Sequence, residues 1–420
     1  MTARWAPRHA WFTVALGIAL AAGPGRTAPL LSPGERMVFL GDSITEQQIY
    51  TRYVMNFFTL RYPGVSFSFR NAGWSGDTAP GGLRRLERDV LSLKPAVVSI
   101  CFGMNDGGYT AFSPAALARY LEGMTGLVQR LQQAGVKVVL LTPGCVDPDR
   151  RGNGAEYNAT LGRFAQAVKE LAAQAGVPCA DIYTLMLDVQ ARAKADQPGF
   201  TMIPDSVHPS PAGHLVMAHG LLKALGGDEP PAVLTLELPA GQVAAVRCAV
   251  SNLVIATDRV SFDRTDEALP VYVDPEAQVI LKYLPFEAEF NAYRLTVRGL
   301  PPGTWRLRVA DMPVGEFAAE ELARGVDLGF RPGPWQELGK AVNELSRAQE
   351  RNYFVRWRQV ALALDLADVQ EEKRQLMEKL DRLIADREAR RIAATANRTW
   401  HWQLERVPAA GTAEQGGAAR

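Results

Sequence analysis

Residue types that can carry out nucleophilic catalysis lie in two short stretches of the chain. Ser43 stands in Gly-Asp-Ser-Ile, directly after the apolar run 38–40, where a buried strand gives way to a helix. A serine hydroxyl becomes a strong nucleophile when a base, usually a histidine oriented by a carboxylate, takes its proton. His208 follows Asp205 by three residues in a proline-rich loop, so both side chains can approach one point. From these residues alone, Ser43 is either a nucleophile or the N-cap of a helix.

The other histidines and the cysteines give no pattern typical of a metal site. His214 and His219 fall at helical spacing after His208, which favours a packing or surface role. The chain has no Cys-x-x-Cys and no histidine-rich ligand set, so we predict neither a metal nor a cofactor. The four cysteines are widely scattered, and we expect small buried thiols while leaving disulfide pairing open: Cys101, Cys145, Cys179 and Cys248.

The elements that must position these residues alternate between strand-like and helix-like stretches over residues 35–226. Five apolar stretches of this region have strand character: 36–40, 65–73, 96–103, 136–143 and 177–183. Strands alternating with helices predict an α/β fold with a doubly wound, five-stranded parallel sheet. Ligands bind at the carboxyl ends of such strands, where the loops 71–78 and 103–106 supply glycine and asparagine beside Ser43.

Four short blocks in this region resemble the signature of the SGNH hydrolases, also called the GDSL esterase family. They occur in the family's order as GDSI, SGDT, GMND and DSVH, and the resemblance covers roughly residues 35–225. Ile44 replaces the leucine of the family name, an apolar exchange that leaves the catalytic residue types intact. The resemblance implies a flavodoxin-like sheet of SGNH type and a serine esterase without metal or cofactor.

Carried over block by block, the resemblance assigns catalytic roles to residues of this chain. Ser43 would attack the ester carbonyl, His208 would move the proton, and Asp205 would orient the imidazole. The oxyanion would be bound by the backbone N–H of Ser43, the N–H of Gly76 and the side-chain amide of Asn105, with Gly73 as second choice for the glycine. Two aromatic residues flank the predicted pocket and either stack on a sugar ring or pack within their loops: Trp74 and Tyr109.

The N-terminus and the charge balance bear on location and partners. Residues 1–22 place Arg4 and Arg8 before an apolar run and end in small residues, which predicts a signal peptide and a secreted or periplasmic protein. An uncleaved N-terminal anchor is the alternative. Lys and Arg number 46 against 45 Asp and Glu, so the net charge of +1 gives no reason to expect nucleic acid, or a membrane beyond export, as a partner.

The C-terminal half changes in texture. We predict a small β-rich domain at 232–311, a helical region at 313–405 and a disordered tail at 406–420, and the oligomeric state stays open. The predicted function is hydrolysis of small acyl esters, above all acetyl esters on carbohydrate, with a small ester or an acetylated polysaccharide as substrate. Two alternatives are a lipase or lysophospholipase, and an inactive carbohydrate-binding or scaffold protein.

Overall fold

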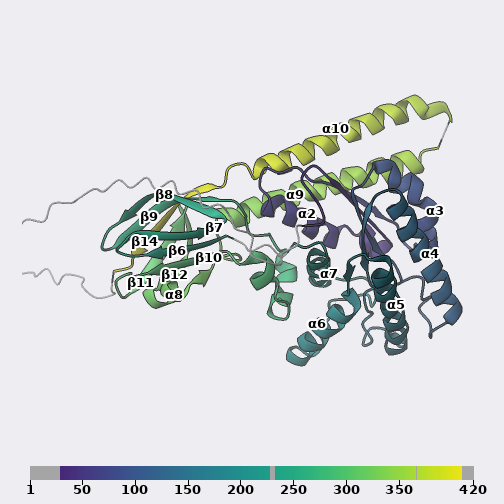
Figure 1. The fold of residues 1–420 in the computed structure, drawn as a ribbon, viewed down its shortest axis with the longest axis horizontal. Helices are drawn as coiled ribbons and strands as arrows, with labels where there is room; N and C mark the ends of the chain where they lie inside the picture. The colour runs from purple at the N-terminus through teal and green to yellow at the C-terminus, as the bar shows by residue number, and fades with distance from the viewer. Residues whose placement is uncertain (1–28, 228–231, 366, 409–420) are drawn as a thin grey trace, which may run out of the picture.

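The computed structural model describes residues 29–227, 232–365 and 367–408 (Figure 1). The predicted signal peptide and residues 409–420 of the predicted tail therefore lie outside the described residues. Over the described ranges, no helix combines the length and apolar character that a membrane span requires.

The N-terminal part is an α/β domain whose sheet has the strand order β2-β1-β3-β4-β5, and every pairing in it is parallel. The first strand, β1, lies in the interior of the sheet. The second strand, β2, is added on one side of β1, and β3 and the later strands are added on the other side. This reversal beside β1 creates the crevice at which ligands bind in open α/β sheets. The strands span Arg36–Gly41 (β1), Ser68–Gly73 (β2), Val97–Cys101 (β3), Lys137–Leu141 (β4) and Cys179–Ala180 (β5).

Helices cover both faces of this sheet, so the predicted doubly wound fold is confirmed. One core lies between the sheet and α2 (Ile49–Arg61), α6 (Ile182–Asp196) and α7 (Pro211–Ala224). The other lies beneath α3 (Ala79–Asp89) and α4 (Pro114–Gln133), and α5 (Gly154–Ala175) contributes to both. The apolar strands have both faces covered, as their near-continuous Val, Ile and Leu runs predict.

The β-rich unit consists of two sheets. Its two sheets have the orders β13-β10-β6-β7 and β12-β11-β14-β9-β8, and they enclose the buried Trp305, Trp335 and Trp402 (Figure 1). The strands span Val233–Glu237 (β6), Gln242–Val246 (β7), Cys248–Ile255 (β8), Arg259–Asp266 (β9), Arg294–Arg298 (β10), Thr304–Val309 (β11), Met312–Ala318 (β12), Val326–Asp327 (β13) and Thr399–Arg406 (β14); α8 spans Ala319–Arg324.

The predicted division at residues 311–313 therefore differs from the structure in three places. Strands β12, β13 and β14 belong to the β unit although they fall in the predicted helical region, and Arg406 ends β14 instead of beginning a tail. Conversely, the segment 269–290 leaves the β unit and packs on the core beneath α2 and α7. Strand β12 forms a local hairpin with β11, whereas β13 and β14 pair with residues far away in the chain, for example His401 with Asp263, so local patterns could not place these two.

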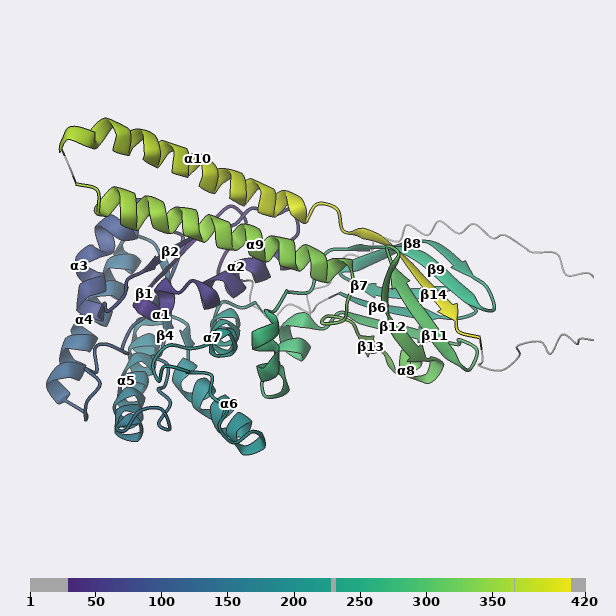
Figure 2. The same cartoon turned by 180° about the vertical axis from the view of Figure 1, so that it is seen from behind.

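A long helical hairpin returns from the β unit across the α/β domain (Figure 2). It consists of α9 (Pro334–Phe354), a π-helical segment (Val355–Leu362) and α10 (Gln370–Ala394). Tyr353, Trp357 and Ile384 of the hairpin join the core beneath α3 and α4. The hairpin is thus part of the packing of the hydrolase-like domain, and β14 then carries the chain back into the β unit.

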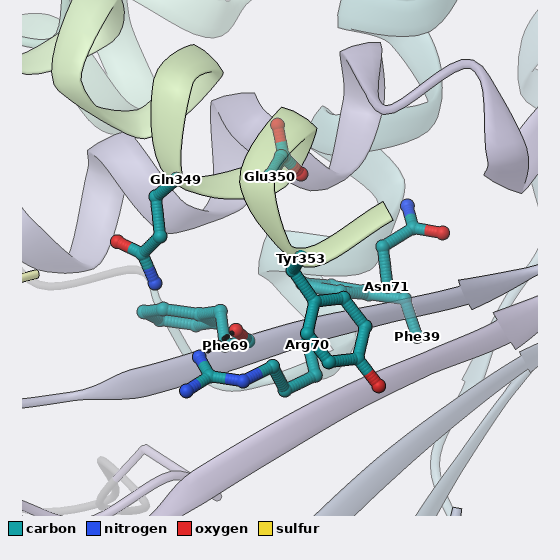
Figure 3. Close-up of a pocket in the computed structure, with 7 residues that line it drawn as sticks. All are labelled: Phe39, Phe69, Arg70, Asn71, Gln349, Glu350 and Tyr353. Carbon is teal, nitrogen blue, oxygen red and sulfur yellow. Dashed lines mark hydrogen bonds between the residues drawn. The ribbon is translucent and has the colours of Figure 1, made fainter. Parts of the chain in front are cut away.

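Polar contacts fix α9 against α2, which is buried along almost its whole length. Asn56 donates to Asn343 and accepts from Ser346, while Thr51 donates to Glu350. Figure 3 shows the C-terminal part of α9 above β1 and β2, with Tyr353 lying over the strands near Asn71 and the Glu350 carboxylate pointing away from them. The polar positions of α2 are therefore satisfied by the hairpin, which explains why a buried helix carries them.

Candidate active site

The Gly-Asp-Ser stretch forms a tight turn between β1 and the short helix α1 (Ser43–Glu46). Asp42 caps α1 by accepting the N–H of Ile44 at 3.0 Å, so Ser43 is the first residue of the helix and not its cap. A Cβ at Gly41 would lie 2.6 Å from the carbonyl oxygen of Cys101, so this approach of β1 to β3 requires glycine. The turn holds the Ser43 side chain at the carboxyl edge of the sheet.

The structure brings Ser43, His208 and Asp205 together in one chain of hydrogen bonds. His208 Nε2 lies 2.9 Å from Ser43 Oγ, and His208 Nδ1 lies 2.7 Å from Asp205 Oδ2. The loop before α7 folds into a turn because Asp205 Oδ1 also accepts the backbone N–H groups of Val207 and His208. Burial raises the pKa of Asp205, but these N–H donors and the His208 ring outweigh it and leave the pKa below its usual value.

Donors for a developing oxyanion lie on the two neighbouring loops. Gly76 is exposed and has a φ of +74°, a left-handed conformation that glycine adopts without strain. Among the described residues, neither the Ser43 nor the Gly76 N–H donates to a protein acceptor. The Asn105 amide donates one hydrogen to the carbonyl oxygen of Asp77 at 2.9 Å and has a second hydrogen left.

Gly73, the second choice from sequence, is occupied otherwise. Its N–H donates to Asn71 Oδ1 at 2.9 Å, and a Cβ there would lie 2.2 Å from the backbone nitrogen of Glu46. The glycine allows β2 to approach α1 closely. It therefore serves the packing of the nucleophile turn, and Gly76 is the glycine whose N–H remains available.

The two flanking aromatic residues are held by protein contacts. Tyr109 donates its hydroxyl to Asn105 Oδ1 at 2.9 Å, and its ring packs on Tyr157 at a centroid distance of 5.1 Å. The Trp74 ring lies 3.4 Å from the Arg358 guanidinium and meets Trp357 edge to face. Both residues thus pack within the protein at the site, the alternative that the sequence left open beside sugar stacking.

Two carboxyl groups, of the buried Asp42 and the partly buried Asp106, brace the loops around Ser43. Asp106 accepts the N–H groups of Ala79 and Gly103 at 2.9 and 3.0 Å, which ties the two donor loops together. Burial raises the pKa of Asp106 to about 6 and that of Asp42 to about 7. Neither side chain is hydrogen-bonded to Ser43, so both hold the backbone geometry of the site.

The remaining histidines and cysteines do not form a second site. His214 is buried, stacks on Tyr50 and hydrogen-bonds Gln47, and burial lowers its pKa to about 3. His219 pairs with Glu289. Within residues 29–227, 232–365 and 367–408, no group of three His, Cys, Asp or Glu side chains is arranged to hold a metal ion. All four cysteines are free.

The sequence analysis missed the contribution of the hairpin to this region. Arg358 covers Trp74 and lies 3.6 Å from Glu46 at the end of α1, and the Trp357 indole N–H donates to Asp89 of α3. These residues follow the signature blocks by about 150 positions and belong to no motif of their own. The available signal is the set of polar residues in α2. Because that helix is buried, another element must supply hydrogen-bond partners for them.

Comparison with known proteins agrees with the geometry. Residues 39–216 match the GDSL-like Lipase/Acylhydrolase family. The match runs from β1 to α7 and so spans most of the α/β domain. An acetylxylan esterase of Geobacillus stearothermophilus is 28% identical over 227 residues, which are 47% of this chain and 96% of that protein. The human isoamyl acetate-hydrolyzing esterase 1 homolog is also 28% identical, over 47% of this chain and 83% of its own. The α/β domain is thus that of a carboxylic ester hydrolase.

The fold as a whole also has a solved counterpart. A gut microbial diltiazem-metabolizing enzyme superposes with a TM-score of 0.79 at 22% identity, covering 91% of this chain and all of that one. At this identity the likeness concerns the fold. It extends beyond the GDSL-like domain into the β unit and the hairpin, so the three-part arrangement is not peculiar to this chain.

Proposed function

We propose that the protein is an exported serine esterase that removes acetyl groups from carbohydrate through an acyl-enzyme. The observation that carries the proposal is the hydrogen-bonded chain from Asp205 through His208 to Ser43, with distances of 2.7 and 2.9 Å. A nucleophile within reach of a base that is itself oriented by a carboxylate is the arrangement that acyl transfer requires.

In the first half of the reaction, Ser43 Oγ attacks the acyl carbon while His208 Nε2 accepts the hydroxyl proton. The tetrahedral oxyanion receives hydrogen bonds from the N–H groups of Ser43 and Gly76 and from the second Nδ2 hydrogen of Asn105. His208 then passes the proton to the departing sugar oxygen, and acetyl-Ser43 remains. Water attacks this ester, His208 accepts its proton, and acetate leaves as the proton returns to Ser43 Oγ.

Two neighbours make this sequence efficient. Asp205 stays ionised because its pKa is depressed, so it accepts the Nδ1 hydrogen and stabilises the imidazolium that forms at His208. Tyr109 is the positioning residue for the oxyanion donor. Its hydroxyl on Asn105 Oδ1 fixes which end of the amide faces Asp77 and which hydrogen faces the substrate.

Acetyl groups and carbohydrate are inferred from the relatives and from access to the site. The names of two relatives refer to acetate esters, and one of them refers to a polysaccharide. The side chains of Asp205 and His208 are 56% and 33% exposed, so a bulky substrate can reach the catalytic edge. Export rests on residues 1–22, whose basic start and apolar run are typical of a signal peptide.

A serine-reactive fluorophosphonate probe tests the mechanism. We expect it to label wild-type protein at Ser43, Ser43→Ala to lose both labelling and hydrolysis, and Ser251→Ala on β8 to retain both. Acetate release from acetylated xylo-oligosaccharides, compared with a series of 4-nitrophenyl esters of increasing chain length, tests the acyl preference. Full activity in Ser43→Ala would contradict the proposed mechanism. A preference for esters with long acyl chains would favour a lipase.

A further inference from the structure

A surface cavity of about 390 Å³ lies directly beside the oxyanion loop. Its wall comes from that loop and from α3, and it is lined by Trp74, Asp77, Gly81, Arg84, Arg85 and Arg88. Asp77 connects it to the catalytic edge, because the Asp77 carbonyl oxygen accepts the Asn105 amide. The cavity therefore adjoins the loop that carries Gly76.

The lining has an excess of positive charge. It contains three arginines against one aspartate, and Arg358 of the hairpin adds a fourth guanidinium over Trp74. Arg85 and Arg88 lie 5.7 and 5.8 Å from the same indole ring. The guanidinium groups of Arg85, Arg88 and Arg358 therefore surround the Trp74 ring beside the oxyanion loop.

The three lining arginines differ in how many of their guanidinium donors are already bound within the protein. Arg85 is buried, and its guanidinium donors already have partners: it binds Asp77 at 2.7 Å and the carbonyl oxygens of Ala72 and Gly41. Arg88 is 55% exposed and binds Asp89 through Nε and Nη2, which leaves Nη1 available. Arg84 is exposed and has no hydrogen-bond or ion-pair partner among the described residues.

The nearby carboxylates are already paired. Asp77 is taken by Arg85, and Asp89 is held by Arg88 and by the Trp357 indole N–H. Glu87 on the outer side of α3 pairs with Arg130. The cavity therefore offers an uncompensated charge at Arg84 and a spare donor edge at Arg88, one helical turn apart on α3.

We propose that Arg84 and Arg88 form a subsite for a carboxylate on the substrate, so that the acetylated carbohydrate contains uronic-acid residues. The planar guanidinium fork matches a carboxylate in geometry and charge, which is why arginine is favoured where carboxylates are recognised. The inference rests on the proposed esterase function and specifies its substrate class. A uronic acid bound here would anchor the sugar chain while a neighbouring acetyl ester lies at Ser43.

A matched pair of substrates tests the subsite. A uronic-acid oligosaccharide and its carboxyl-reduced counterpart are acetylated chemically to the same degree, and kcat/KM is measured for both. Exposed ion pairs contribute little each, so two of them predict a preference of roughly 2- to 30-fold for the carboxylated substrate at low salt. Raising the NaCl concentration to 0.5 M should reduce this preference, because salt screens exposed charges.

Variants assign the preference to the two arginines. Arg84→Gln combined with Arg88→Gln should bring the kcat/KM ratio of the pair close to one and lose more activity on the carboxylated substrate than on 4-nitrophenyl acetate. Arg306→Gln serves as the matched control, because Arg306 is an exposed arginine on β11 that pairs with Glu316. It should keep the wild-type ratio, and circular dichroism shows whether each variant is folded.

The possible failures are distinguishable. A wild-type enzyme that hydrolyses both oligosaccharides equally well, or a double variant that keeps the preference, would overturn the carboxylate subsite and leave the esterase intact. An equal loss of preference in Arg306→Gln would overturn it too. A wild-type enzyme inactive on both oligosaccharides and on 4-nitrophenyl acetate would overturn the proposed function itself.

Discussion

Removing one hydroxyl group, in Tyr109→Phe, tests how the Asn105 amide is held. The Tyr109 hydroxyl is the donor to Asn105 Oδ1 at 2.9 Å, and burial, with a contribution from Asp42, raises the pKa of Tyr109 to about 12. The hydroxyl therefore stays protonated, and remains a donor, throughout the pH range of an assay. Phenylalanine preserves the ring packing on Tyr157 and removes only this hydrogen bond.

The expected magnitude follows from the role of the bond. Deleting an oxyanion donor outright, as in Asn105→Ala, typically lowers kcat by about 10²- to 10³-fold. Tyr109→Phe leaves Asn105 in place with its bond to the Asp77 carbonyl, so it costs only the orientation that one neutral hydrogen bond supplies, about 0.5–1.5 kcal/mol. That corresponds to a loss of roughly 2- to 13-fold in kcat. KM should change little, because the oxyanion charge is absent from the ground state.

The assay is a double-mutant cycle on 4-nitrophenyl acetate with kcat and KM determined separately. If Tyr109 acts through Asn105, the double variant should be no slower than Asn105→Ala within a factor of a few. Tyr183→Phe is the control, since its hydroxyl donates to the backbone carbonyl of Asn158. It tests the loss of a tyrosine hydroxyl bond that does not involve Asn105.

Two results would refute this reasoning. Fully additive losses would show that Tyr109 does not act through Asn105. A raised KM with unchanged kcat would show that Tyr109 contacts the substrate directly, as in the stacking role that the sequence left open.

The helical hairpin yields three further predictions. Burial raises the pKa of Glu350 from 4.5 to about 7, so the folded state holds a proton that the unfolded chain releases, and stability falls as pH rises from 4.5 to 7. Glu350→Gln should escape this loss, which is on the order of 3 kcal/mol in urea unfolding at the two pH values; parallel pH dependences would contradict it. Trp357→Ala should lower the free energy of unfolding by about 3–5 kcal/mol, since it empties a buried site and removes the indole N–H from Asp89, which keeps Arg88 as a partner; a loss below 1 kcal/mol would show that the hairpin is peripheral. A chain ending at Gly227 should melt at a lower temperature or aggregate, because α2 loses its polar partners, whereas melting at the wild-type temperature would show that the domain does not need α9.

The sequence alone predicts the α/β domain and the candidate catalytic residues at one edge of its sheet. Each of the four signature blocks is a short contiguous stretch: GDSI, SGDT, GMND and DSVH. Because the carboxyl ends of parallel strands lie at one edge of the sheet, strand order and spacing suffice to predict that the blocks meet there. The Asp205 turn is equally local, since its carboxylate binds N–H groups two and three residues away. Residues whose partners lie close in sequence could be placed correctly without coordinates.

The surroundings of that edge depend on contacts between distant parts of the chain. Arg358 reaches Trp74 and Glu46 from a helix more than 280 residues later, and Glu350 meets Thr51 across 299 residues. Strand β14 pairs with β9 and β11, although the whole helical hairpin separates it from them in the sequence. Such pairings depend on which buried surfaces remain uncovered once the local elements have formed, and no periodicity within a short window encodes that choice.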